Sequence, residues 1–115
     1  AGHPQAVASS APMENVEVTI EELGIRDCFG AIVSGDDVTR GKPHPQVFTT
    51  AAGRLGVKPI DCIVVEDAVV GVQAGIRAGM TVYAVTNTRR REELYRADRI
   101  VDSLEELTAD DFVLP

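Results

Sequence analysis

Residues 62–79, with the sequence CIVVEDAVVGVQAGIRAG, decide the fold. The segment Cys62–Val65 is uniformly apolar and has the length of a buried parallel strand. The acidic pair Glu66–Asp67 follows it, and helical spacing then runs from about Val69 to Ala78 and stops at Gly79. A strand, a short polar loop and a helix in this order are the repeating unit of an α/β fold.

The rest of the chain repeats the alternation of strand and helix. Four further apolar runs predict strands, at Ala6–Ala8, Ala31–Val33, Val82–Val85 and Ile100–Val101. Helical spacing occurs over Met13–Leu23, which stands between Pro12 and Gly24, and over Pro45–Leu55, which is followed by Gly56. A shorter fourth segment with helical spacing covers Arg90–Arg96. The pattern predicts one domain over residues 1–115, a three-layer Rossmann-like α/β fold whose mostly parallel sheet carries helices on both faces.

Composition narrows the classes of function. The 115 residues carry a net charge of −7, which argues against nucleic acid as a partner because an acidic surface repels phosphate backbones. The cluster Arg89–Arg91 is a local exception that we interpret as a solvated helix face. No apolar stretch approaches the length of a membrane span, and no leader pattern is present, so we expect a cytoplasmic protein without a membrane partner. Cys28 and Cys62 lack metal-ligand spacing and favour neither a disulfide nor a zinc site.

Polar signals follow three of the predicted strands. Ser9–Ser10 come after the first strand, Lys42 lies in the loop beyond the second, and Glu66–Asp67 come after the third. Ligands of open α/β sheets bind at the carboxyl ends of the strands. We therefore expect these side chains, distant in sequence, to meet at one site.

Each of the first two signals is suited to holding a phosphate group. The hydroxyls of Ser9 and Ser10, with backbone N–H groups before a helix start, can donate to phosphate oxygens, although serine there is often a simple cap. Lys42 stands between Gly41 and Pro43 in a stiff loop that can aim its ammonium at a phosphoryl group. The alternative for Lys42 is a solvent-exposed loop lysine.

The third signal is suited to a metal ion. Adjacent carboxylates at Glu66 and Asp67 match the preference of Mg²⁺ for one or two protein carboxylates plus water. The alternative is that Asp67 caps the following helix. Small residues at Gly71, Ala74, Gly75 and Ala78 form a strip that would let this helix lie close to the sheet.

Taken together, the segments AVASSAP, GKPHPQVF, VVEDAVVGVQAG and RAGM resemble the haloacid dehalogenase superfamily, in its β-phosphoglucomutase-like and sugar-phosphatase-like branch. The resemblance covers nearly the whole chain. It implies that Ser9 contacts the transferring phosphoryl group, that Lys42 neutralises its charge, and that Glu66 and Asp67 bind Mg²⁺. It also implies a small phosphorylated metabolite as substrate, turned over by phosphoryl transfer through an aspartyl phosphate.

One part of the family pattern has no match. The family's first motif, Asp-x-Asp on a central strand, supplies the nucleophile, and no Asp-x-Asp occurs in these 115 residues. Asp36 and Asp37 lie in the loop before Lys42 and are poor substitutes. We therefore expect a carboxyl-terminal portion, without nucleophile or cap domain, that is inactive as an isolated chain. The alternatives are a non-catalytic phosphate-binding or assembly module and, less well matched, a receiver-type signalling domain, whose lysine would follow the last strand.

The resemblance also predicts an incomplete sheet. In the family, the strand of the first motif lies between those that correspond here to residues 6–8 and 63–65. Without it, these two strands either pair directly or leave exposed edges that a homodimer would complete.

Overall fold

The computed structural model describes residues 4–24, 27, 29–87 and 89–112. Its strands and α-helices, in chain order, are β1 (Ala6–Ala8), α1 (Met13–Leu23), β2 (Ala31–Val33), α2 (Gln46–Leu55), β3 (Ile63–Glu66), α3 (Val69–Arg77), β4 (Thr81–Val85) and β5 (Arg99–Val101). Three short 3-10 helices lie between these elements, namely η2 (Gly35–Asp37), η3 (Pro59–Asp61) and η4 (Arg91–Leu94), and two follow β5, namely η5 (Leu104–Glu106) and η6 (Ala109–Phe112). The five predicted strands and the first three predicted helices are confirmed. Cys28 lies outside the described residues.

The fourth predicted helix is wrong. Residues 91–94 form the single 3-10 turn η4, in which Glu93 N donates to Arg90 O at 3.0 Å. Leu94 is the buried residue of this turn, at 1% exposure. A segment with one anchoring apolar side chain has no stripe to pack, and so short a helix has too few hydrogen bonds to offset its nucleation cost.

The helix ends follow the local sequence. Gly24 and Gly56 cap α1 and α2 with φ values of 66° and 72°, a left-handed conformation that glycine adopts without steric cost. Each cap N–H donates to carbonyls of the last helical turn. These two glycines therefore place the helix ends where the sequence predicts them.

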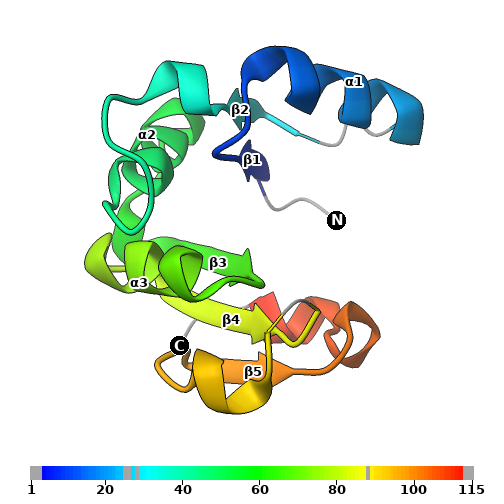
Figure 1. Ribbon diagram of the computed structural model, residues 1–115, viewed down its shortest axis with the longest axis vertical. Helices are drawn as coiled ribbons and strands as arrows, with labels where there is room; N and C mark the ends of the chain where they lie inside the picture. Colours follow the sequence, from blue (N-terminus) through cyan, green and yellow to red (C-terminus); the bar gives the residue numbers. More distant parts are fainter. Residues whose placement is uncertain (1–3, 25–26, 28, 88, 113–115) are drawn as a thin grey trace.

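The strands form two parallel sheets instead of one continuous sheet (Figure 1). In the first, Ala6 lies opposite Ala31 and Ala8 opposite Val33. The second has the order β3-β4-β5. The version of our expectation in which the strands at residues 6–8 and 63–65 pair directly is wrong, because β1 pairs with β2 and β3 with β4. Helix α2 contacts β1 and β2 of the first sheet and also α3, which packs on the second sheet. The two sheets are therefore joined by packed helices, and their edge strands do not pair.

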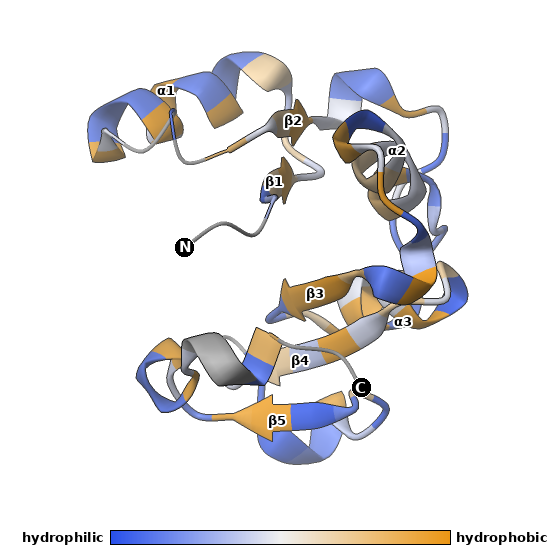
Figure 2. Cartoon of the chain, turned by 180° about the vertical axis from the view of Figure 1, so that it is seen from behind, coloured by the Kyte–Doolittle hydropathy of each residue, from blue (hydrophilic) through white to orange (hydrophobic). Residues whose placement is uncertain are grey.

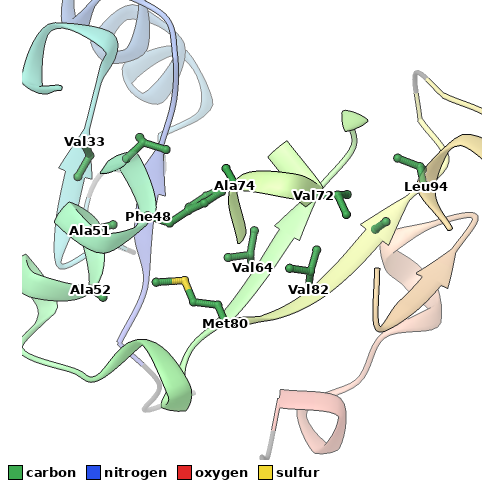
Figure 3. Packing of buried hydrophobic residues seen from close by; sticks show 12 residues of the cluster. Val33, Phe48, Ala51, Ala52, Val64, Val72, Ala74, Met80, Val82 and Leu94 are labelled. Atoms are coloured by element: carbon green, nitrogen blue, oxygen red, sulfur yellow. The ribbon is translucent and has the colours of Figure 1, made fainter. Parts of the chain in front are cut away.

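A single hydrophobic core connects the two sheets (Figure 3). It combines Val33 of β2 with side chains of α2, α3, β3 and β4, and Phe48 reaches from α2 toward Ala74 of α3. Gly75 of α3 has its Cα so close to β4 that an added Cβ would lie 2.7 Å from Val82 Cγ2. The predicted close approach of this helix to the sheet is therefore confirmed at Gly75.

Helices cover both faces of the first sheet, since α1 and α2 lie on opposite sides of β1 and β2 (Figures 1 and 2). Helix α1 is amphipathic: it buries Val16 and Ile20 and exposes Glu14, Glu21 and Glu22. Of the helices in the described part of the chain, none is both long enough and apolar enough to cross a membrane.

Candidate functional site

The loop after β1 carries Ser9 and Ser10. Ser9 N donates to Val33 O at 2.9 Å, and Ala11 N donates to Ser9 Oγ at 3.1 Å. The Ser9 hydroxyl acts as an acceptor in this bond and can still donate its own proton. The cap position of α1 is Pro12, so neither serine is the simple helix cap of the alternative interpretation.

The start of α1 is less available to a ligand than the sequence predicts. Met13 N, the first N–H of the helix, donates to Asp36 Oδ2 at 2.8 Å. An N-terminal N–H group that serves a phosphate must be free to point at it. Met13 N is therefore engaged within the chain, and the N–H groups of the preceding loop are the ones left for a phosphate.

The loop of Lys42 is ordered by its own side chains. Gln46 Oε1 accepts hydrogen bonds from Thr39 N and Arg40 N, both at 2.8 Å, and His44 Nδ1 accepts one from Gln46 N at 3.1 Å. The Lys42–Pro43 peptide bond is cis. These contacts fix the backbone on both sides of Lys42.

The Lys42 side chain is mostly buried. Its Nζ lies 2.9 Å from Glu66 Oε2 and 5.1 Å from the centre of the Phe48 ring. The side chains of Lys42 and Glu66 are 12% and 11% exposed. The alternative of a solvent-exposed loop lysine is therefore wrong. An ammonium group has three donors, so the bond to Glu66 orients Lys42 and leaves capacity for an anion.

Glu66 is engaged through both carboxylate oxygens. Oε2 faces Lys42, and Oε1 accepts from Asp67 N at 3.2 Å and from Ala68 N at 3.3 Å. An added Cβ at Gly71 would lie 2.0 Å from Glu66 Cδ, so this carboxylate occupies the space a larger residue would fill. The cap position of α3 is Ala68, so the alternative that Asp67 is the cap residue is wrong.

The predicted side chains meet around one open cavity of about 510 Å³. Ser9 and Ser10 reach it from the first sheet, and Glu66 and Asp67 from the second. Lys42 lines it from the intervening loop. The predicted convergence of the three signals at the carboxyl ends of the strands is confirmed, while the chemical roles of these residues stay predictions.

The donor set does not complete a magnesium site. Among the residues that the structure describes, no group of three or more His, Cys, Asp or Glu side chains is placed to hold a metal ion. Of the two predicted ligands, Glu66 is paired with Lys42 and with two N–H groups. A cation here would have Asp67 as its main carboxylate and would need further ligands from water or from outside the chain.

These features define a class of protein. Parallel strands linked by helices, with a serine loop, a buried lysine and an acidic pair around one cavity at the carboxyl ends, are the arrangement of a Rossmann-like α/β protein. The sequence model of the haloacid dehalogenase-like hydrolases matches residues 1–79. The chain therefore belongs to the haloacid dehalogenase-like hydrolase family.

Individual relatives agree with this assignment. A bifunctional riboflavin kinase/FMN phosphatase of Arabidopsis thaliana is 41% identical over 99% of this chain and 31% of its own length. Hexitol phosphatase B of Escherichia coli K12 is 35% identical over 93% of this chain and 49% of its own. The chain thus spans half or less of these relatives.

Solved structures share the fold. A point mutant of the CbbY protein of Rhodobacter sphaeroides, crystallised with xylulose-(1,5)bisphosphate, superposes with a TM-score of 0.90 at 32% identity, over 98% of this chain and 52% of that one. A β-phosphoglucomutase of Clostridium difficile superposes with a TM-score of 0.85 at 32% identity, over 93% and 46%. Members of this superfamily generally use Mg²⁺.

Some residues of the site are not evident from the sequence. Asn87, Val70 and Leu104 line the cavity, and Phe48 lies beside the Lys42 ammonium. Asn87 lies two residues after the end of β4. A polar residue just beyond a predicted strand could have been recognised from the sequence as a candidate site residue. Phe48 has the spacing of a core residue, and nothing local distinguishes it from its neighbours on α2.

Proposed function

We propose that this chain provides the phosphate-binding side of a phosphoryl-transfer site for a small phosphorylated metabolite. The observation that carries the proposal is the position of the Lys42 ammonium and the Ser9 hydroxyl on one cavity. A sugar phosphate is the substrate class we favour, because the relatives named above include a hexitol phosphatase and a β-phosphoglucomutase.

Each residue has a distinct part in this proposal. Lys42 offsets the charge on the phosphoryl oxygens, and Glu66 holds Lys42 in place. Ser9 donates its hydroxyl proton to a phosphoryl oxygen, and the Ser10 backbone N–H, which has no partner among the described residues, donates beside it. Mg²⁺ would be held weakly by Asp67 and would supply further charge neutralisation when bound.

We further propose that the isolated chain does not turn substrate over. Phosphoryl transfer in this family needs an attacking carboxylate, and no Asp-x-Asp is present. The engagement of Glu66 with Lys42 also favours a second candidate function, a non-catalytic module that binds phosphate. The cytoplasmic location stays a prediction.

Binding of inorganic phosphate, followed by amide NMR of the chain, tests the site. We expect shifts at the Ser9, Ser10 and Ala11 amides, and at least roughly tenfold weaker binding in Lys42→Ala, since a hydrogen bond to a charged group contributes about 1.5–3 kcal/mol. Lys58→Ala is the matched control, because Lys58 is the other lysine of the chain and is exposed. Equal binding by the two variants would contradict the proposed site.

The same preparations test activity. With Mg²⁺ and an aryl phosphate, we expect no hydrolysis above the buffer rate. Hydrolysis that Lys42→Ala abolishes would refute the proposed inactivity while supporting the site.

A further inference from the structure

The carboxylate of Asp36 accepts a hydrogen bond from Met13 N, at the start of the helix that follows the loop of Ser9 and Ser10. We propose that Asp36 is a positioning residue for this loop, acting through the start of α1 rather than by touching the ligand. The inference deepens the proposed function and rests on it.

The first observation is how α1 begins. Its cap residue is Pro12, which makes no side-chain cap hydrogen bond. Asp36 Oδ2, from 23 residues further along the chain, accepts instead from Met13 N at 2.8 Å. Caps normally come from the residue adjoining the helix. Here the cap links the end of the serine loop to η2.

The second observation is that the neighbours of Asp36 contact the same loop. Gly35 N donates to Ala11 O at 2.7 Å, and an added Cβ at Gly35 would lie 2.3 Å from Ser10 O. Ser9 N donates to Val33 O at 2.9 Å. Residues 33–36 therefore run alongside residues 9–13 and contact them at both ends and in the middle.

The third observation is that the η2 turn, from which Asp36 extends, is held by its own side-chain hydrogen bonds. Ser34 is fully buried, and its hydroxyl accepts from Asp36 N at 3.2 Å. Asp37 Oδ2 accepts from Ser34 N at 2.8 Å, which completes the capping box of η2. Asp36 thus extends from a hydrogen-bonded turn. Through its bond to Met13 N, this turn would set the position of the serine loop.

Electrostatics and positioning predict opposite results when Asp36 is replaced. Removing a negative charge from an acidic protein strengthens anion binding if charge alone matters. Loss of a positioning contact weakens it. Asp61→Ala, at an exposed residue of η3, removes the same charge away from the site and gives the electrostatic baseline.

The test compares phosphate dissociation constants of the unmodified chain, Asp36→Ala, Asp36→Asn and Asp61→Ala, each shown to be folded by circular dichroism. We expect Asp36→Ala to bind at least fivefold more weakly than Asp61→Ala, and Asp36→Asn, which keeps an acceptor oxygen for Met13 N, to stay within twofold of the unmodified chain. Asp36→Ala binding as tightly as Asp61→Ala, or more tightly, would overturn the inference.

A measurement without phosphate separates this inference from the proposed function. If the unmodified chain shows no Lys42-dependent phosphate binding, the proposed function fails. The amide shifts of Ser9, Ser10 and Ala11 in ligand-free protein then decide the inference on their own. We expect these shifts to change in Asp36→Ala and to persist in Asp36→Asn and Asp61→Ala, and their persistence in Asp36→Ala would refute it.

Discussion

Glu66 connects the parts of the site at the scale of single residues. Its carboxylate faces Lys42, accepts from two backbone N–H groups and lies against the bare Cα of Gly71. The sequence predicts Gly71 as part of a strip that packs on the sheet. In the structure, the absent side chain of Gly71 makes room for the Glu66 carboxylate.

Gly71→Ala tests this relation. The added Cβ would meet the outer atoms of Glu66, a flexible side chain that can move, so we expect the helix to persist and the Lys42–Glu66 pair to break. Loss of a charge-assisted bond outweighs the gain of alanine over glycine, so the free energy of unfolding should fall by about 1–2 kcal/mol. Urea denaturation measures this change.

Gly53→Ala is the matched control for this substitution. It also replaces a helical glycine, but its Cβ would meet nothing within 4 Å. We expect it to stabilise the chain by about 0.5–1 kcal/mol. A Gly71→Ala variant as stable as Gly53→Ala would show that Glu66 does not depend on this space.

Sequence reasoning reaches part of the site at this scale. It places Lys42 and Glu66 at the same sheet edge because each follows a predicted strand. It does not predict their direct contact or the Phe48 ring beside Lys42, because partners separated by 24 residues are set by tertiary packing. For the same reason it misses Asp36, whose partner lies in another element.

At the scale of elements, η2 depends on the charge of Asp37. The Ser34 backbone N–H that donates to Asp37 holds the pKa of this carboxyl below its ordinary value of 3.8. The Ser34 hydroxyl and Arg54 also lower this pKa, whereas burial raises it. A pKa that is lower in the folded state adds stability above the unfolded value. That stability is lost as the pH falls through the folded pKa.

We therefore expect the free energy of unfolding to decline as the pH drops from about 5 to below 3.8, and to decline less steeply in Asp37→Asn. Part of the decline should remain, because hydrogen bonding from Thr108 and Arg99 lowers the pKa of Asp111 as well. Chemical denaturation at a series of pH values measures both slopes. An Asp37→Asn slope as steep as that of the unmodified chain would contradict the assignment.

Elements with their own boundary signals are the ones that sequence predicts well. Helices α1 and α2 end at Gly24 and Gly56, as expected. The segment at residues 91–94 has charged residues in helical order but one buried side chain, and it forms only a 3-10 turn. Periodicity of charge without an apolar stripe was insufficient for a helix.

At the scale of the whole molecule, the α/β class is confirmed, but the sheet is divided. Sequence patterns indicate which residues form strands. Which strands pair with each other depends on how the connecting helices pack. Helix α2 joins both halves. The cavity between the sheets retains three exposed apolar side chains, Val65 at 42%, Val70 at 45% and Leu104 at 59%.

The edge of β3 that faces β1 carries N–H groups for which the described residues supply no strand partner. Thr81 N donates to Cys62 O at 3.1 Å, and hydrogen-bonding directions alternate along a parallel strand, so Val65 N points away from β4 and toward this edge. Unpaired edges with apolar surroundings recruit further strands. We therefore propose a homodimer that uses this edge.

Sedimentation equilibrium tests the homodimer, with an expected mass of twice the 12.3 kDa of one chain at micromolar concentrations. Val65→Pro removes the edge N–H without touching the ladder to β4, so we expect it to give a folded monomer. Val65→Thr keeps both the N–H and the branched shape, and it should still dimerise. A chain that is monomeric throughout, or a dimer that Val65→Pro leaves intact, would rule out pairing at this edge, because the proposal requires that N–H group.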